Sequence, residues 1–150
     1  MYSDSDWAGE KITRRSTTGG IASWGASILK SWSNRQSVIA RSSGEAEYYA
    51  LGKGLSEGMG IRAIAADFGW DLKIVCNLDS SAAKAMASRV GLGKTRHIEV
   101  LYLWVQDIVK NKWLQLRKIP GDKNPSDVLT KSKSYDEMFE MVYDLLNIRF

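Results

Sequence analysis

The chain is poor in the residues that build disulfide scaffolds and zinc sites. Its 150 residues include one cysteine and one histidine. A single cysteine, Cys76, cannot form a disulfide within the chain, so a disulfide-stapled fold is excluded and a reducing compartment is favoured. Because cysteine and histidine do not occur as a cluster, a zinc site of the usual kind is excluded as well.

Long apolar runs are also missing. No run approaches the ~18 apolar residues of a membrane span, and no signal peptide is visible, so we expect an intracellular protein with no membrane partner. The length of 150 residues fits one domain, and a hydrophobic content of 44% is enough to form its core. The net charge of +4 is compatible with a polyanionic partner, although many proteins of other functions share it.

The spacing of apolar residues predicts an α/β fold. The expected strands cover residues 2–8, 20–24, 28–32, 72–79 and 113–119. The expected helices cover residues 42–68, 81–88, 97–111 and 134–148, and a further helix starts at 124–127. Antiparallel strands come first and strands separated by helices follow, which predicts a mixed sheet flanked by helices.

Four acidic residues lie at junctions between these elements. Asp4 is in the first expected strand, Glu47 is on the core-facing side of the first helix, Asp79 ends a strand and Asp127 opens a helix. A sheet of this kind would gather such carboxylates at one end. Oxygen ligands without cysteine or histidine suit magnesium or manganese, and two such ions held by shared carboxylates can cut phosphodiesters.

Each of these residues also has a purely structural interpretation. Asp127 can stabilise a helix start by ~0.3–1 kcal/mol, and Asp79 can cap a helix. Glu47 is the strongest single candidate, because a carboxylate that faces the core is costly unless something compensates it. Asp6 competes with Asp4, since both side chains point to the same side of a strand.

Six motifs occur in an order that is specific when taken together. They are Tyr2 to Gly9, Arg14 to Gly19, Ser42 to Tyr48, Leu78 to Lys84, Thr95 to Val100 and Asn124 to Lys131. Over residues 2–131 the chain resembles the ribonuclease H domain of copia-type (Pseudoviridae) LTR retrotransposon Pol polyproteins. Asn77 stands where many copia elements place an aspartate, but Asp79 fits the Asp-Ser-Ser-Ala-Ala-Lys variant better.

This resemblance implies one ribonuclease H-like domain over residues 1–150, with a mixed five-stranded sheet, a shortened first strand and an extra helix over 134–148. It implies cleavage of the RNA strand of RNA/DNA hybrids with two Mg²⁺ ions, or Mn²⁺ as a substitute. The implied catalytic and metal-binding residues are Asp4, Glu47, Asp79 and Asp127. An upstream reverse transcriptase domain is the implied partner, in a cytoplasmic virus-like particle or in the nucleus.

A basic loop is the candidate surface for nucleic acid. Arg89, Lys94 and Arg96 are expected to contact phosphates, or else to be ordinary solvated side chains. His97, the single histidine, either makes a structural hydrogen bond or contacts substrate. The loop over 120–124 has no histidine, although cellular relatives place a mobile one there.

Two other functions compete with the ribonuclease. One is a catalytically weak or inactive fragment that keeps the fold and binds nucleic acid, which the shortened first strand favours and the four acidic residues oppose. The other is a DNA-cutting integrase or resolvase of the same superfamily, against which Glu47 on the first helix argues.

Overall fold

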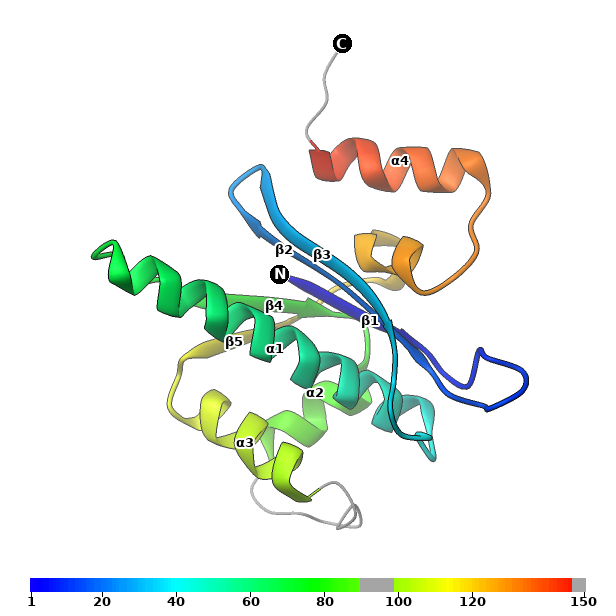
Figure 1. Cartoon of the computed structure of the whole chain (residues 1–150), viewed down its shortest axis with the longest axis horizontal. Coiled ribbons are helices and arrows are strands. Elements are labelled where there is room, and N and C mark those ends of the chain that lie inside the picture. Colours follow the sequence, from blue (N-terminus) through cyan, green and yellow to red (C-terminus); the bar gives the residue numbers. More distant parts are fainter. Residues whose placement is uncertain (90–98, 147–150) are drawn as a thin grey trace.

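One mixed sheet organises the domain (Figure 1). The computed structural model describes residues 1–89 and 99–146. The strands are β1 (Tyr2–Asp6), β2 (Thr17–Trp24), β3 (Ser27–Arg35), β4 (Ile74–Leu78) and β5 (Leu114–Lys118), in the order β3-β2-β1-β4-β5. β1, β2 and β3 pair antiparallel, whereas β4 runs parallel to β1 and β5 parallel to β4. The predicted α/β class with a mixed five-stranded sheet is confirmed.

Helices cover the sheet and extend beyond it. They are α1 (Ser43–Asp67), α2 (Ser81–Ser88), α3 (Glu99–Lys110) and α4 (Tyr135–Leu146), with short 3₁₀ helices η2 (Gly121–Lys123) and η3 (Pro125–Leu129). α1 crosses the sheet with α2 and α3 beside it, and η3 and α4 lie apart from them (Figure 1). The helices α1, α2 and α3 lie on one face of the sheet, and η3 and α4 lie on the other. Successive strand residues point to opposite faces. A Cβ atom at Gly19 would meet the η3 segment, and a Cβ atom at the next residue, Gly20, would meet Trp32 on the α1 face.

The long helix α1 begins where the sequence predicts. The Glu45 amide donates to Ser42 Oγ at 3.2 Å, and the Glu45 carboxylate reaches back to the Arg41 amide. Close packing against α3 explains one of its glycines, since a Cβ at Gly52 would lie 2.5 Å from Leu101 Cδ1. Gly60 has nothing within 4 Å of such an atom, so close packing does not explain it.

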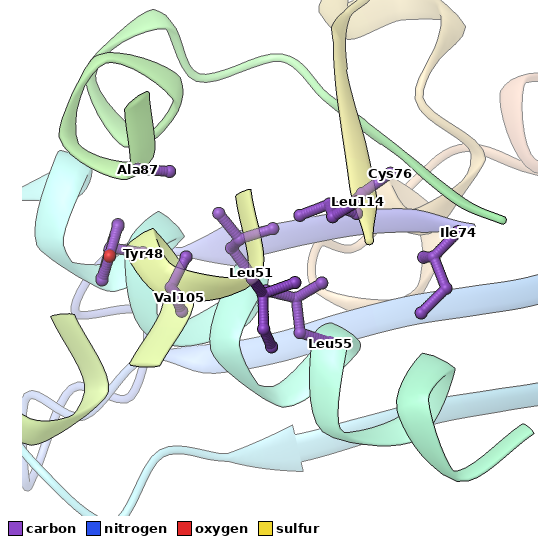
Figure 2. Close-up of a cluster of buried hydrophobic side chains, with 9 residues drawn as sticks. Tyr48, Leu51, Leu55, Ile74, Cys76, Ala87, Val105 and Leu114 are labelled. Carbon is purple, nitrogen blue, oxygen red and sulfur yellow. The ribbon is translucent and has the colours of Figure 1, made fainter. Parts of the chain in front are cut away.

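The main apolar core lies between α1 and the β4–β5 part of the sheet and is closed by α2 and α3 (Figure 2). Its buried members are Tyr48, Leu51, Leu55, Ile74, Cys76, Ala87, Val105, Ile108 and Leu114. Full burial raises the pKa of the Cys76 thiol to about 12, so this cysteine stays a neutral core residue. Among the described residues no helix is both long and apolar enough to cross a membrane.

Two local expectations were wrong. β1 ends at Asp6 rather than at residue 8, because Ala8 adopts a positive φ of 54° and begins a turn. Trp7 and Trp24 are large aromatic residues, which sequence alone predicts to pack in the core, but they are 53% and 48% exposed. The predicted helix start at 124–127 is present as the 3₁₀ helix η3, in which Asn124 is the cap residue that accepts a hydrogen bond from the Ser126 amide and Asp127 lies in the first turn.

Candidate metal centre

Strand register places two of the four predicted carboxylates side by side. β1 and β4 are parallel neighbours in which Tyr2 pairs with Asn77. Asp4 lies two residues after Tyr2 in β1, in the middle of the sheet. Asp79 lies two residues after Asn77, directly after β4. Asp4 is fully buried and Asp79 is half-buried. Because side chains alternate along a strand, the even spacing brings both carboxylates to one side.

Asp6, the competitor of Asp4, has a different role. Its carboxylate accepts a hydrogen bond from the Thr17 amide, across the hairpin between β1 and β2. This bond holds the end of the hairpin. The structure therefore places Asp4, and not Asp6, beside Asp79.

The third carboxylate comes from η3, which packs on the sheet through a buried polar contact. Asn124 Nδ2 donates to the Ser3 carbonyl of β1 at 3.0 Å, and Asn124 and Ser126 are both fully buried. This contact places Asp127 above β1. Carboxylate oxygens of Asp4, Asp79 and Asp127 all lie within 4.8 Å of one another, and we call these three residues the aspartate cluster.

Glu47 lies beside the aspartate cluster on the side of α1. Its Oε1 accepts a hydrogen bond from the Ser5 amide at 3.2 Å, so the side chain points to the end of β1 and not to open solvent. Burial, reinforced by the negative charges of Asp4 and Asp79, raises the pKa of Glu47 from 4.5 to about 9. Without a cation, this carboxyl group therefore holds a proton at neutral pH.

The pKa values of Asp4 and Asp127 are shifted in opposite directions. Burial raises the pKa of Asp4, against the opposing hydrogen bond from Thr130 and the charge of Lys131. Burial also disfavours the charged form of Asp127, but hydrogen bonds from Lys131 and Lys133 outweigh it and lower the pKa of Asp127. Crowded carboxylates with opposite shifts are a mark of functional sites.

A bound cation could satisfy one buried oxygen of the aspartate cluster. Asp4 Oδ2 accepts the Thr130 hydroxyl, but Asp4 Oδ1 is buried and has no hydrogen-bond partner within the described part of the chain. A buried carboxylate oxygen without a partner is costly, and a bound cation would remove that cost. Several carboxylate oxygens without nitrogen or sulfur fit Mg²⁺ or Mn²⁺.

Gly19 is what allows η3 to lie so close to β1. It pairs with Asp4 across the β1–β2 ladder. A Cβ at this position would lie 2.6 Å from Thr130 Cγ2 and 2.9 Å from the Ser126 carbonyl. Since backbone cannot yield as a flexible side chain can, a larger residue at Gly19 must displace the segment that carries Asp127.

We expect Gly19→Ala to lower the free energy of unfolding by about 1–3 kcal/mol, as overpacking commonly does. Chemical denaturation of the metal-free protein measures this. The matched control is Gly60→Ala, where the new methyl group meets nothing within 4 Å and should stabilise α1 by up to ~1 kcal/mol. Equal stability of the Gly19→Ala variant and the parent chain would contradict the proposed tight packing.

The predicted phosphate contacts are only partly described. Arg89 is the exposed C-cap residue of α2. Lys94, Arg96 and His97 lie outside the described residues. Sequence reasoning missed Thr130, Lys131 and Lys133 as neighbours of the carboxylates. The available signal is the spacing of four between Asp127 and Lys131, both of which lie in the motif from Asn124 to Lys131.

Comparison with known proteins agrees with this geometry. No protein-family model matches the chain. The Retrovirus-related Pol polyprotein from transposon TNT 1-94 of Nicotiana tabacum is 29% identical over 150 residues, covering 98% of this chain and 11% of the polyprotein. The Pol polyprotein from transposon RE1 of Arabidopsis thaliana is 31% identical over 137 residues, covering 89% of this chain and 9% of that protein. The chain thus spans about a tenth of the length of these curated relatives.

Solved structures define the class of fold. LC11-RNase H1, isolated from compost, matches with a TM-score of 0.66 and 19% identity, covering 86% of this chain and 89% of that one. Its structure in complex with RNA/DNA hybrid matches with a TM-score of 0.63 and 18% identity, over 86% and 91% of the two chains. The chain therefore has the ribonuclease H fold. It is a ribonuclease H-like domain that matches copia-type retrotransposon Pol polyproteins over most of its length, as the six motifs indicated.

Proposed function

We propose that this domain is a ribonuclease H, an endonuclease that hydrolyses the RNA strand of RNA/DNA hybrids. One observation carries the proposal: three aspartates from distant parts of a ribonuclease H fold converge within 4.8 Å, and one of their buried oxygens lacks a partner. Asp4, Asp79 and Asp127 would hold divalent ions, with Glu47 completing the set from α1. Magnesium is the expected ion and manganese a possible substitute.

The residues of the chain prepare this site for the reaction. When bound, two such ions supply an activated water molecule and stabilise the charge that develops on the leaving oxygen. Asp4 is held in the middle of the sheet by strands on both sides, with the Thr130 hydroxyl fixing one of its oxygens. The Ser5 amide orients Glu47 in the same way. Ligands fixed before the substrate arrives do not need to reorganise during the reaction.

The choice of substrate rests on the fold and on charge. LC11-RNase H1, which shares the fold, has been crystallised in complex with RNA/DNA hybrid. The net charge of +4 suits a polyanionic duplex. We expect selection of hybrids through 2′-hydroxyl contacts and duplex shape in the minor groove, without reading of base sequence. An upstream reverse transcriptase domain is the proposed partner in a parent polyprotein.

Strand-labelled duplexes test this function. The purified domain is incubated in magnesium with an RNA/DNA hybrid labelled on either strand, and with RNA/RNA and DNA/DNA duplexes of the same sequence. Cleavage of the RNA strand in the hybrid alone is the expected result. Cleavage of the DNA/DNA duplex would instead support an integrase-like or resolvase-like nuclease.

The basic residues Arg89, Lys94 and Arg96 provide a separate prediction about binding. If they contact phosphates, their triple replacement by alanine will weaken hybrid binding and make it less dependent on salt, because fewer counterions are released. The loss should be similar for hybrids of any sequence, since phosphate contacts carry no base information. Titration of both proteins at three salt concentrations measures this, and superimposable curves would assign the three residues to an ordinary solvated loop.

A further inference from the structure

Two lysines already neutralise one carboxylate of the aspartate cluster. Lys131 Nζ lies 2.5 Å from Asp127 Oδ1, and Lys133 Nζ lies 2.8 Å from Asp127 Oδ2. Both oxygens of this ligand therefore face an ammonium group. A divalent ion that approaches Asp127 meets a cation that is covalently tied to the same segment of chain.

Of the two lysines, Lys131 occupies the more central place. Its ammonium is also 3.6 Å from Asp4 Oδ2, so it spans carboxylates from β1 and η3. The backbone fixes this arrangement, because the Lys131 amide donates to the Asp127 carbonyl at 3.0 Å in the turn that ends η3. The preceding residue, Thr130, donates its hydroxyl to the same oxygen of Asp4. Five consecutive residues thus supply one ligand, one orienting hydroxyl and one bridging cation.

The Lys131 side chain is placed so that it can leave. It is 44% exposed, whereas the carboxylate of Asp4 is completely buried and that of Asp127 is 9% exposed. A lysine ammonium on a flexible four-carbon chain regains full hydration when it turns outward. The two carboxylates cannot follow it, because β1 and η3 hold them. Departure of Lys131 would leave both carboxylates available to another cation.

We propose that Lys131 is a tethered counter-ion that holds Asp4 and Asp127 together in the metal-free domain and competes with the divalent ion for them. Lys131 is in this sense a positioning residue, and it sets the ion concentration at which the site fills. The inference rests on the proposed function, since it concerns the ion that the reaction requires. It adds that the chain contains its own competitor for that ion.

Electrostatics sets the direction and scale of the effect. A unit positive charge within about 4 Å of two carboxylates cancels part of the attraction that a divalent ion would otherwise gain from them. Lys131→Met removes that charge and keeps most of the side-chain volume. We expect the variant to bind Mn²⁺ about tenfold more tightly than the parent chain.

Calorimetric titration of the purified domain with Mn²⁺, in the absence of nucleic acid, measures the affinity directly. Lys131→Arg keeps the charge and should bind Mn²⁺ nearly as the parent does. Lys53→Met is the matched control, because Lys53 also is 44% exposed and pairs with an acidic residue four positions away, Glu57, at 2.7 Å. It removes the same charge from a lysine that, among the ion pairs of the described residues, pairs with Glu57 and with no member of the aspartate cluster, and it should leave the affinity unchanged. Thermal unfolding with and without Mn²⁺ checks that each variant folds.

A purely structural role gives a different pattern. Lys131→Met would then lower the melting temperature equally with and without Mn²⁺, leaving the Mn²⁺-induced shift unchanged, whereas competition predicts a larger shift in the variant. Equal or weaker Mn²⁺ affinity of Lys131→Met overturns the inference while leaving the proposed function intact, as does equal tightening in Lys53→Met. If the parent chain and Lys131→Met both bind no Mn²⁺, the metal site fails and the proposed function fails with it.

Discussion

Replacement of Asp4 by asparagine is expected to reduce cleavage of an RNA/DNA hybrid by about a thousandfold or more, which corresponds to at least about 4 kcal/mol of transition-state stabilisation. Asp4 is the fully buried member of the aspartate cluster, and its Oδ1 is the oxygen that lacks a partner in the described structure. Asparagine keeps the size of the side chain but loses the charge that attracts a divalent ion. Single-turnover cleavage at saturating magnesium measures the loss.

The Asp4→Asn variant should nevertheless remain folded. Burial raises the pKa of Asp4, so its charged form is unfavourable in the metal-free protein, and a neutral amide relieves that cost. The amide oxygen can still accept the Thr130 hydroxyl. In urea denaturation with EDTA present to remove metal, we therefore expect the variant to unfold at a urea concentration equal to or above that of the parent chain.

A charge-matched control separates this effect from a loss of net charge. Asp107→Asn removes one exposed carboxylate on α3, outside the site, and should leave cleavage unchanged. Asp4→Asn would refute the role of this aspartate if it retained more than about a tenth of the parent rate. Loss of cleavage with a large loss of stability would point to a structural role instead.

Glu47→Gln is expected to stabilise the metal-free domain at alkaline pH by several kcal/mol, and by at most about 6 kcal/mol. The folded-state pKa of Glu47 is raised to about 9 from the ordinary 4.5, mainly by burial and then by the charges of Asp4 and Asp79. Glutamine imitates the protonated carboxyl group, which is the form that the folded protein prefers. It also keeps the oxygen that accepts the Ser5 amide.

The sign of the pH dependence follows from the direction of this shift. A group whose pKa is higher in the folded state contributes its full stability below the unfolded value, here about 4.5. That contribution is lost as the pH rises toward about 9, by up to roughly 1.4 kcal/mol per pH unit. The parent chain should therefore lose stability relative to Glu47→Gln between pH 5 and 9, and the two should agree near pH 4.5.

Urea denaturation in EDTA at pH 5, 7 and 9 measures this difference. Comparison with the variant isolates Glu47, because the other titrating groups are common to both proteins. A difference in unfolding free energy that stays constant across the three pH values would show that Glu47 is not shifted. Added Mn²⁺ should reduce the difference, since a cation favours the ionised carboxylate.

Much of this site could be predicted from the sequence, because strand and cap patterns are local. The apolar alternation before Asp79 defined β4, and the Ser42 cap defined the start of α1 on which Glu47 lies. Once β1 and β4 are parallel neighbours, Asp4 and Asp79 must end close together. These steps need only periodicity and the parallel arrangement that strands separated by helices adopt.

The remaining features depend on contacts that no local pattern contains. Asp4 and Asp6 point to the same side of β1, and only the hydrogen bond from the Thr17 amide assigns Asp6 to the hairpin. The attachment of η3, and with it Asp127, to β1 depends on the hydrogen bond from Asn124 Nδ2 to the Ser3 carbonyl, 121 residues away. The position of Lys131 near Asp4 depends on the turn that ends η3, in which the Lys131 amide donates to the Asp127 carbonyl. Such long-range contacts decide which charged side chains meet.

Cleavage of an RNA-labelled RNA/DNA hybrid by the purified domain, with magnesium and then with EDTA, tests the central claim most directly. A functional metal centre at Asp4, Asp79 and Asp127 predicts that the RNA strand is cut into shorter fragments in magnesium and stays intact in EDTA, while the DNA strand stays intact in both. A domain that binds the hybrid but leaves the RNA intact in both magnesium and manganese would contradict the claim and identify a nucleic-acid-binding module without catalytic activity.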